Sequence, residues 1–178
     1  MHNTEVWACV KYLFWIGVFS LPIGAMLPRS RFQRDCYPFR AMKWERDGQI
    51  YEKLRVREWK DKMPDASKAV SYLAKKKLSG SIQSDQVERL VQETCVAELT
   101  HIFLIGLGFG CVLIAKSIYG FVLSLLWGIG NLVFIVIQRY NRPVLIKLAD
   151  KLRRREETVL YHMKENLEEV LPSNGHVA

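Results

Sequence analysis

Residues 100–138 read THIFLIGLGFGCVLIAKSIYGFVLSLLWGIGNLVFIVIQ, and this stretch decides the fold. Apart from Lys116 it contains no lysine, arginine, aspartate or glutamate. As one helix it would reach roughly 58 Å at about 1.5 Å per residue, about twice a hydrocarbon core of ~30 Å. The stretch must therefore fold back on itself. The polar and small residues at 116–120 mark the turn, so we expect a helical hairpin over residues 100–115 and 118–138.

The first helix of this hairpin is shorter than the about 20 residues that a crossing needs, so we expect it to continue backward through residues 84–99. A second apolar run, residues 6–27, also has the length of a crossing. Its flanking charges are reversed relative to a signal peptide, because Glu5 precedes the run and Arg29 follows it. We therefore expect a retained anchor, and the sequence predicts an all-α integral membrane protein with three transmembrane helices.

Charge divides the chain into four segments. Most lysines and arginines lie in residues 28–99 and 139–178, whereas the hairpin of residues 100–138 and the N-terminal transmembrane helix, residues 1–27, are nearly free of them. By the positive-inside rule the two basic segments face the cytoplasm and the N-terminus lies outside, in a multi-pass cell-membrane protein. We expect a cytoplasmic helical loop region over 28–99 and a C-terminal amphipathic helix with a tail over 139–178. That helix fits equally well on the inner leaflet or, as a solvated helix, against the loop region.

The overall composition narrows the class of partner. The chain has 178 residues with 26 Lys+Arg against 18 Asp+Glu, a formal net charge of +8. A basic surplus suits nucleic acid or anionic lipid, and in a chain with membrane spans lipid headgroups and topology explain it. We therefore expect membrane lipids as partners and no nucleic acid. The four cysteines show neither CxxC nor metal-ligand spacing, so we expect free thiols and no metal.

Polar residues inside the apolar stretch suggest a functional site, because ionisable groups are costly in a membrane. His101 opens the second span and Asn131 lies in the third, and counting from the turn places them within roughly 5 Å of the same depth. Glu98 lies three residues before His101 on the same helix face, so we expect it to accept the imidazole N–H and fix the tautomer. Glu93 is a second candidate acidic partner. Nearby at the cytoplasmic end of the third span lie Gln138, Arg139, Asn141 and Arg142.

These residues alone leave the class of protein open. A lone histidine at a membrane boundary often lies at the interface without a catalytic role, and buried polar residues also hold helices together. On the residues alone, an enzyme and a non-enzymatic membrane adaptor or scaffold are equally supported. In the loop region, residues 44–64, WERDGQIYEKLRVREWKDKMP, interleave aromatic and charged side chains. That pattern suits an interfacial aromatic belt or a site that binds a sugar or a phosphate.

Residues 44–64 together with ETCVAELTH (93–101) and NLVFIVIQRYNRP (131–143) resemble the glycosyl-4,4′-diaponeurosporenoate acyltransferase family, small bacterial membrane enzymes of carotenoid-glycoside biosynthesis. The similarity runs over roughly residues 35–145 in consistent order. QRYNRP after an apolar helix is the most specific string, and Glu-x-x-His is the weakest. The resemblance implies transfer of a fatty acyl group from an acyl thioester to a sugar hydroxyl of a lipid-linked glycoside, a carotenoid glycoside or another glycolipid. It favours the enzyme over the adaptor.

Acyl transfer to a hydroxyl needs a base, a site for the oxyanion and dry positioning of both substrates. We expect His101, oriented by Glu98, to act as the base, and Asn131, or Gln138 with Arg139, to stabilise the oxyanion. No nucleophile elbow is present, so direct transfer without an acyl-enzyme is expected, and no cofactor is needed. The donor substrate would be acyl-CoA or an acyl-carrier protein, with its phosphates near Arg142, Lys60 and Arg57. The remaining predicted substrate-binding residues, chiefly for the sugar, are Tyr51, Trp59, Asp61 and Asn141.

Overall fold

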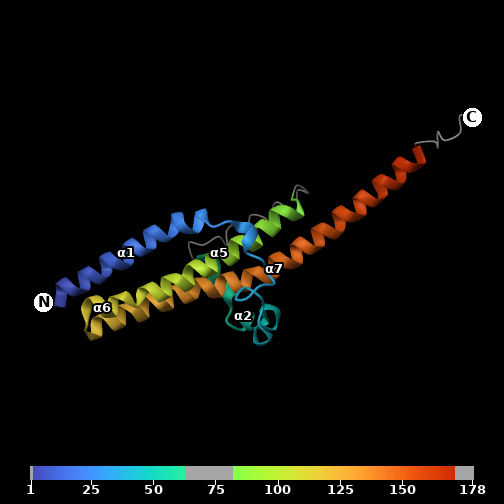
Figure 1. Ribbon diagram of the computed structural model, residues 1–178. Helices are drawn as coiled ribbons and strands as arrows, with labels where there is room; N and C mark the ends of the chain where they lie inside the picture. The colour runs from blue at the N-terminus through green and yellow to red at the C-terminus, as the bar shows by residue number, and fades with distance from the viewer. Residues whose placement is uncertain (1, 63–81, 171–178) are drawn as a thin grey trace, which may run out of the picture.

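The computed structural model describes residues 2–62 and 82–170, and these are helical or irregular. The long helices are α1 (His2–Met26), α5 (Ser84–Gly108) and α7 (Ile118–Val170), and the short α6 (Gly110–Ala115) follows α5 (Figure 1). Three helical stretches are long and apolar enough to cross a membrane: Asn3–Met26, Ser84–Ala115 and Ile118–Glu168. The all-α architecture with three candidate spans is therefore as predicted.

The hairpin forms where the sequence indicates. α5 begins at Ser84 and continues through the predicted boundary at residue 99, and α6 follows it to the turn. At the turn Lys116 adopts the left-handed conformation with φ of 42°. A Cβ at Gly120 would lie 2.5 Å from the carbonyl oxygen of Cys111, so glycine is required for the close return of the chain.

The helix of the third span continues past residue 139, where the sequence analysis divides the hairpin from the C-terminal helix. α7 runs unbroken from Ile118 to Val170 and contains Pro143. The drop in hydropathy at the membrane boundary changes only the surroundings of the helix. Between Pro143 and the end of α7 the sequence holds neither glycine nor proline, so nothing in it ends the helix.

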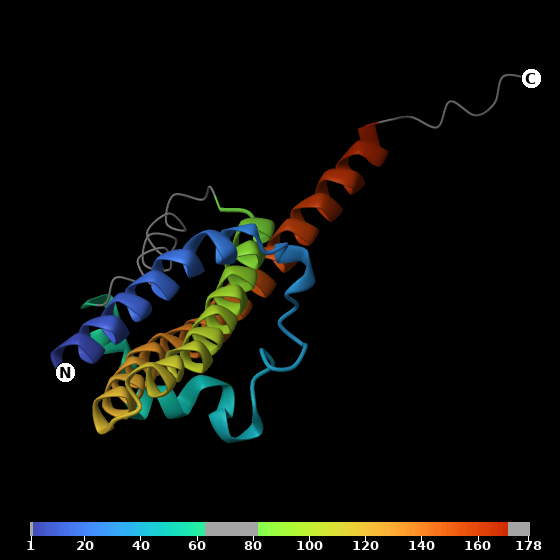
Figure 2. The same ribbon diagram turned by 60° about the vertical axis from the view of Figure 1, so that its left-hand side comes forward.

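α5 and α7 lie side by side along most of the length of α5 (Figures 1 and 2). Within the apolar part, Trp127 lies against Gly108 and donates from Nε1 to the carbonyl of Leu104 at 2.9 Å. Outside it, the same two helices bury Val91 against Leu145 in one apolar cluster. One pair of helices thus forms both the membrane bundle and its extension.

α7 continues past the start of α5 and leaves the bundle (Figure 1). The carboxylate of Glu156 accepts the backbone N–H of Ser84 at 2.8 Å, which caps the start of α5. From residue 157 to 168 the side chains of α7 are exposed, the apolar Leu160 and Leu167 among them. The first part of the predicted amphipathic helix therefore packs on α5, and placement of the rest on a leaflet stays a prediction.

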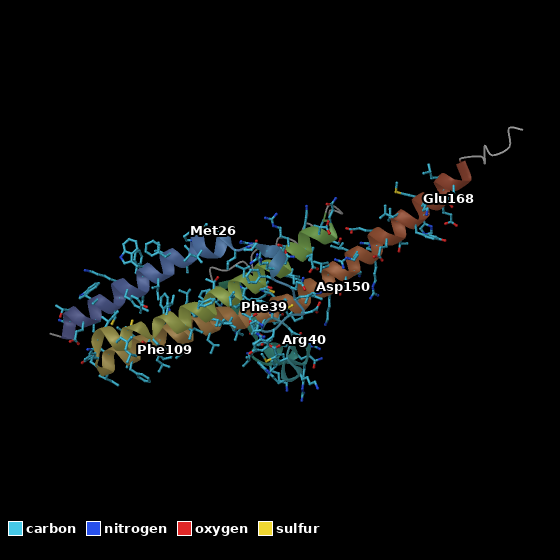
Figure 3. The ribbon with its side chains drawn as sticks, in the orientation of Figure 1. Met26, Phe39, Arg40, Phe109, Asp150 and Glu168 are labelled. Carbon is cyan, nitrogen blue, oxygen red and sulfur yellow. The ribbon has the colours of Figure 1, made fainter. Side chains whose placement is uncertain are left out.

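α1 packs more loosely, against the hairpin. Tyr12 donates its hydroxyl to the carbonyl of Leu107 at 2.8 Å and fills the space left by Gly110. Along the spans large apolar side chains face outward: Met26 is 83% exposed and Phe109 is 55% exposed (Figure 3). Such surfaces suit contact with lipid tails.

The described part of the loop region, residues 28–62, folds as short helices laid over α5 and α7 (Figure 2). Its Tyr51 and Val56 are buried with Ile137 of α7 in one apolar cluster. This packing brings loop side chains to the end of the third span. The elements are η1 (Arg29–Arg31), η2 (Lys43–Gly48), α2 (Gln49–Lys53), α3 (Val56–Trp59) and η3 (Lys60–Lys62).

Candidate active site

A buried network of four charges lies where η2, α5 and α7 meet. Glu98 of α5, with a side chain 2% exposed, accepts from Arg139 Nε at 3.2 Å and also from Arg142 Nη2. Arg139 Nη1 lies 3.0 Å from Oε1 of Glu45. Two guanidinium groups thus neutralise two carboxylates, which burial of charge requires.

The local backbone explains how Glu45 reaches this network. Its Oε2 accepts the N–H of Met42 at 2.6 Å in a capping box that opens η2, and its Oε1 accepts the hydroxyl of Tyr51. Gly48, with φ of 92°, connects η2 to α2, and the ring of Pro143 lies against it. Only glycine takes this conformation easily, so Gly48 allows η2 to lie directly on α7.

Arg142 is held at every guanidinium nitrogen. Nε donates to Thr94 Oγ1 at 2.9 Å, Nη1 to the carbonyl of Phe39 at 2.8 Å, and Nη2 to the carbonyl of Thr94 and to Glu98. The guanidinium carbon also lies 5.7 Å from the centre of the Phe39 ring. This saturation fixes Arg142 as a bridge between α7, α5 and the loop region.

The other predicted substrate-binding residues differ in burial: some are buried against α7, and others stay within the loop region. Lys60, 7% exposed, donates from Nζ to Asn141 Oδ1 at 2.9 Å. Gln138 lies on α7 with Asn141 and is 1% exposed. Trp59 is half-buried and donates its indole N–H to the carbonyl of Leu54 at 3.1 Å, within its own loop segment. The side chain of Asp61 lies outside the described part of the structure.

His101 and Asn131 form a separate polar pair, on the membrane side of this network. His101 Nδ1 lies 2.9 Å from Asn131 Oδ1, and the imidazole stacks on Phe134 with ring centres 4.9 Å apart. The prediction that the histidine and the asparagine share one depth is confirmed. Asn131 also donates from Nδ2 to the carbonyl of Trp127 at 2.9 Å.

The prediction of a hydrogen bond between Glu98 and His101 is wrong. Among the described residues no hydrogen bond joins them, because the Glu98 carboxylate is taken up by Arg139 and Arg142. Charge-assisted bonds to two guanidinium groups are stronger than one to a neutral imidazole. Glu93 pairs elsewhere as well, with Arg29 Nε at 2.9 Å.

The asparagine fixes the histidine tautomer. Because Asn131 Nδ2 donates to a carbonyl, its Oδ1 is the atom that faces His101, and an oxygen only accepts. Nδ1 of His101 therefore carries the hydrogen. In the neutral ring the lone pair then lies on Nε2, which is the nitrogen able to take a proton.

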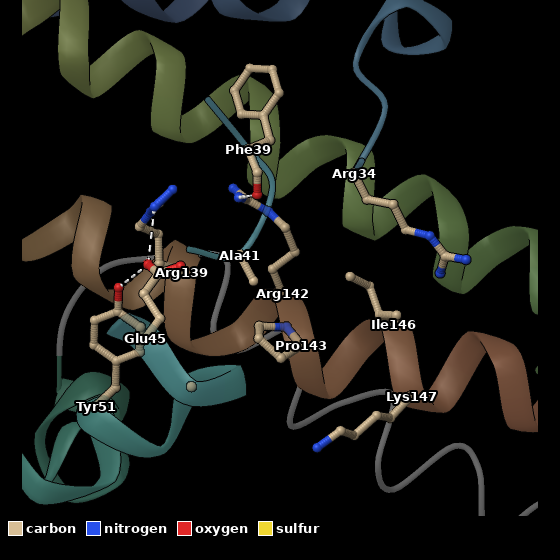
Figure 4. Close-up of a pocket in the computed structure, with 11 residues that line it drawn as sticks. Arg34, Phe39, Ala41, Glu45, Tyr51, Arg139, Arg142, Pro143, Ile146 and Lys147 are labelled. Atoms are coloured by element: carbon tan, nitrogen blue, oxygen red, sulfur yellow. Dashed lines mark hydrogen bonds and ion pairs between the residues drawn. The ribbon is translucent and has the colours of Figure 1, made fainter. Parts of the chain in front are cut away.

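A cavity of about 140 Å³ lies beside the charged network (Figure 4). Figure 4 shows Tyr51, Glu45 and Arg139 joined along one wall, with Arg142 beside them and Lys147 at the side. Burial and the bond to Glu45 raise the pKa of Tyr51, so its hydroxyl stays neutral and able to donate. The lining residues are Arg34, Phe39, Ala41, Glu45, Gly48, Tyr51, Arg139, Arg142, Pro143, Ile146 and Lys147.

Sequence reasoning missed Thr94 and Arg34 as members of this site, and it placed Glu45 in the 44–64 pattern without a role of its own. Thr94 carried a readable signal, because Thr94, Glu98 and His101 follow one another at helical spacing on one face of α5. Glu45 carried a weaker one, its position three residues after Met42 in a short capping box. The place of Arg34 depends on the path of the loop region, which no local pattern encodes.

Comparison with known proteins gives one consistent result. Residues 28–151 match the family described as CrtO: Glycosyl-4,4'-diaponeurosporenoate acyltransferase. The glycosyl-4,4'-diaponeurosporenoate acyltransferase of Staphylococcus aureus strain N315 is 27% identical over 156 residues, which cover 84% of this chain and 90% of the relative. The protein of that name from strain bovine RF122 / ET3-1 is 28% identical with the same coverage. No solved structure matches. The matched range contains η2, α5 and the first part of α7, and thus every residue of the charged network.

Proposed function

The chain belongs to the glycosyl-4,4′-diaponeurosporenoate acyltransferase family, and from this premise we propose that it transfers a fatty acyl group from an acyl thioester to a sugar hydroxyl of a lipid-linked glycoside. The family name implies a glycosylated carotenoid acid as acceptor, and a related glycolipid is the alternative. Membership in an acyltransferase family decides between enzyme and adaptor in favour of the enzyme. We place the reaction at the cytoplasmic leaflet, where the basic segments predict the end of the third span to lie.

We propose His101 as the general base. The observation that carries this role is the 2.9 Å bond between His101 Nδ1 and Asn131 Oδ1, with the amide itself fixed by Trp127. It leaves Nε2 as the proton-accepting nitrogen. Asn131 thereby takes over the orienting part that the sequence suggested for Glu98.

The proposed reaction is one direct displacement. Nε2 of His101 takes the proton of the acceptor hydroxyl while its oxygen attacks the thioester carbonyl. The tetrahedral intermediate collapses, the C–S bond breaks, and the leaving thiolate takes the proton back from the imidazolium. The products are a sugar ester and a free thiol, and the base is regenerated.

For the oxyanion, Gln138 with Arg139 and Asn131 stay alternatives. The amide of Asn131 is engaged with His101 and Trp127, and the guanidinium nitrogens of Arg139 are engaged with Glu98, Glu45 and the carbonyl of Pro38, although Arg139 also lines the cavity. Arg142 and Lys60 were expected to hold donor phosphates. Their bonds to Thr94, Glu98 and Asn141 support positioning roles instead. Lys147, exposed beside the cavity, offers a positive charge for the donor phosphates.

The test is acylated glycolipid measured by mass spectrometry in membranes that contain the wild-type protein or His101→Ala at matched expression. We expect a loss of about 10²–10⁴-fold in the initial rate of transfer, the usual contribution of a general base. His162→Ala is the matched control, because His162 is exposed on the projecting part of α7. Normal product from His101→Ala would overturn the assignment of the base.

A further inference from the structure

His101 contacts a second residue of α7 that takes no part in the proposed reaction, the phenyl ring of Phe134. The two rings are stacked, with their centres 4.9 Å apart and their planes inclined by 7°. Phe134 lies three residues after Asn131, so both side chains project from one face of α7. That face holds the imidazole at two places, by an amide and by a ring.

The two contacts restrain different movements of the imidazole. The hydrogen bond between Nδ1 and Asn131 Oδ1 holds one edge of the ring and fixes the direction in which that nitrogen points. A single hydrogen bond leaves the ring able to turn about the line that joins these two atoms. Stacking on Phe134 opposes this turn, because a turned ring would lose its parallel contact. Both contacts together therefore set the direction of the Nε2 lone pair.

Phe134 is itself held by the loop region. It packs against the apolar cluster that Tyr51, Val56 and Ile137 form. Tyr51 in turn donates its hydroxyl to Glu45, a member of the charged network. Contacts between side chains therefore connect the charged network with the imidazole, and Phe134 is the member of this cluster that stacks on the ring.

Packing against the loop region does not by itself require a flat ring at position 134. The neighbouring members of the cluster on α7, Val133, Val136 and Ile137, are aliphatic. An aliphatic side chain in place of Phe134 would still bury apolar surface there, but it would present no flat face to the imidazole. The flat face thus matters for the imidazole more than for the cluster, which separates positioning of the base from packing of the core.

We infer that Phe134 is a positioning residue for acyl transfer, whose ring fixes the plane of the His101 imidazole and so the direction in which Nε2 meets the acceptor hydroxyl. The inference rests on the proposed function, in which Nε2 takes the proton. Phe134 acts on the base and not on either substrate. Its loss should therefore lower kcat and leave KM nearly unchanged, the pattern of an interaction that matters only in the transition state.

The first test is steady-state acyl transfer by the full-length protein in membranes with Phe134→Leu, which keeps an apolar side chain and removes the flat ring. We expect kcat per folded molecule to fall about tenfold through misalignment of the base, with KM within about twofold of wild type. Phe134→Tyr keeps the ring and should restore kcat to within about twofold of wild type. Phe121→Leu is the matched control, because Phe121 is 50% exposed in the apolar part of the same helix.

Val136→Ala separates positioning from packing, because Val136 packs against the same cluster and carries no ring. It should lower the Tm and leave kcat per folded molecule within about twofold of wild type. An equal loss of kcat in Val136→Ala and Phe134→Leu would show an effect of packing and overturn the inference. Phe134→Met, which also lacks a ring and is close to phenylalanine in size, replaces Phe134→Leu if that variant fails to accumulate.

The second test, NMR of histidine-labelled protein, does not depend on activity. Protons that lie over a phenyl ring resonate upfield, and His101→Ala identifies the His101 signals. We expect these signals to move downfield in Phe134→Leu and to stay near their wild-type positions in Phe134→Tyr and Val136→Ala. Unchanged signals in Phe134→Leu would overturn the inference.

The activity of two variants separates this inference from the proposed function. Inactive His101→Ala together with a wild-type kcat in Phe134→Leu would leave the base standing and overturn the role of Phe134. Normal transfer by His101→Ala would instead contradict the proposed base, whatever the NMR signals show of the stacked rings.

Discussion

α5 and α7 contribute to two polar regions of opposite character, which lie about one turn apart on α5 (Glu98 and His101) and about two turns apart on α7 (Arg139 and Asn131). The charged network of Glu45, Glu98, Arg139 and Arg142 is buried and saturated with ion pairs. The His101–Asn131 pair is uncharged when the imidazole is neutral, makes one hydrogen bond between its members, and leaves the imidazole only half-buried. The first region is built to stay fixed, because any change exposes a buried charge. The second retains a nitrogen that is able to exchange a proton.

Removal of a carboxylate from the fixed region should have the largest effect on folding. Glu98→Ala leaves two buried guanidinium groups without their shared partner, and we expect a loss of about 3–5 kcal/mol in the free energy of unfolding. Thermal unfolding and accumulation in membranes measure this, with Glu157→Ala as the exposed control. If Glu98→Ala folds with a wild-type Tm and loses only activity, Glu98 belongs to the chemistry and the comparison fails.

The proton-exchanging region should show the reverse pattern under Asn131→Ala. Without the amide oxygen the imidazole loses its fixed tautomer, and we expect the transfer rate to fall about 10- to 100-fold while the Tm changes little. Steady-state acylation at matched expression reports the rate, and Asn166→Ala on the exposed end of α7 is the control. A wild-type rate in Asn131→Ala would mean that the asparagine does not orient the base.

Arg142→Lys keeps the positive charge but removes the branched guanidinium group, so it tests whether Arg142 belongs to the fixed region or contacts the substrate. A lysine reaches at most part of the set formed by Thr94, Phe39 and Glu98, so we expect a loss of about 1–3 kcal/mol in stability. Transfer per folded molecule should stay within about twofold of wild type. A large loss of activity with unchanged stability would move Arg142 from positioning to substrate contact.

Tyr51→Phe should have the smallest effect, about 1 kcal/mol, because it removes one hydrogen bond to Glu45. Burial raises the pKa of Tyr51 above its unfolded value near 10, so the folded state favours the neutral phenol. The stability that this shift contributes is fully present below about pH 10 and is lost as pH rises further. Unfolding of wild type and Tyr51→Phe at pH 7, 9 and 10.5 should show a constant difference at first and a smaller one at the highest pH.

The sequence predicts the membrane architecture well, because hydropathy and rise per residue are local quantities. The turn near Lys116 and the shared depth of His101 and Asn131 both follow from counting residues along helices. The partner of Glu98 does not follow from counting. Its choice depends on Arg139 and Arg142 reaching it across the helix interface, at sequence separations of 41 and 44 residues.

Glu45 shows the same limit more strongly. It meets Arg139 across 94 residues, and only the folded loop region brings η2 onto α7. The continuation of α7 past residue 139 is a different case. The change in hydropathy there predicts a change from lipid to water around the helix, and it carries no signal that ends the helix. Composition predicts which segments lie in the membrane, whereas the end of a helix depends on residues such as glycine and proline.

The 53 residues of α7 form one unbroken helix of roughly 80 Å, and it contributes Asn131, Arg139 and Arg142. The exposed Leu160 and Leu167 are therefore carried by the same continuous helix as the residues of the proposed site. A partner or a surface that bound them would be connected to that site through one backbone, without contact with either substrate.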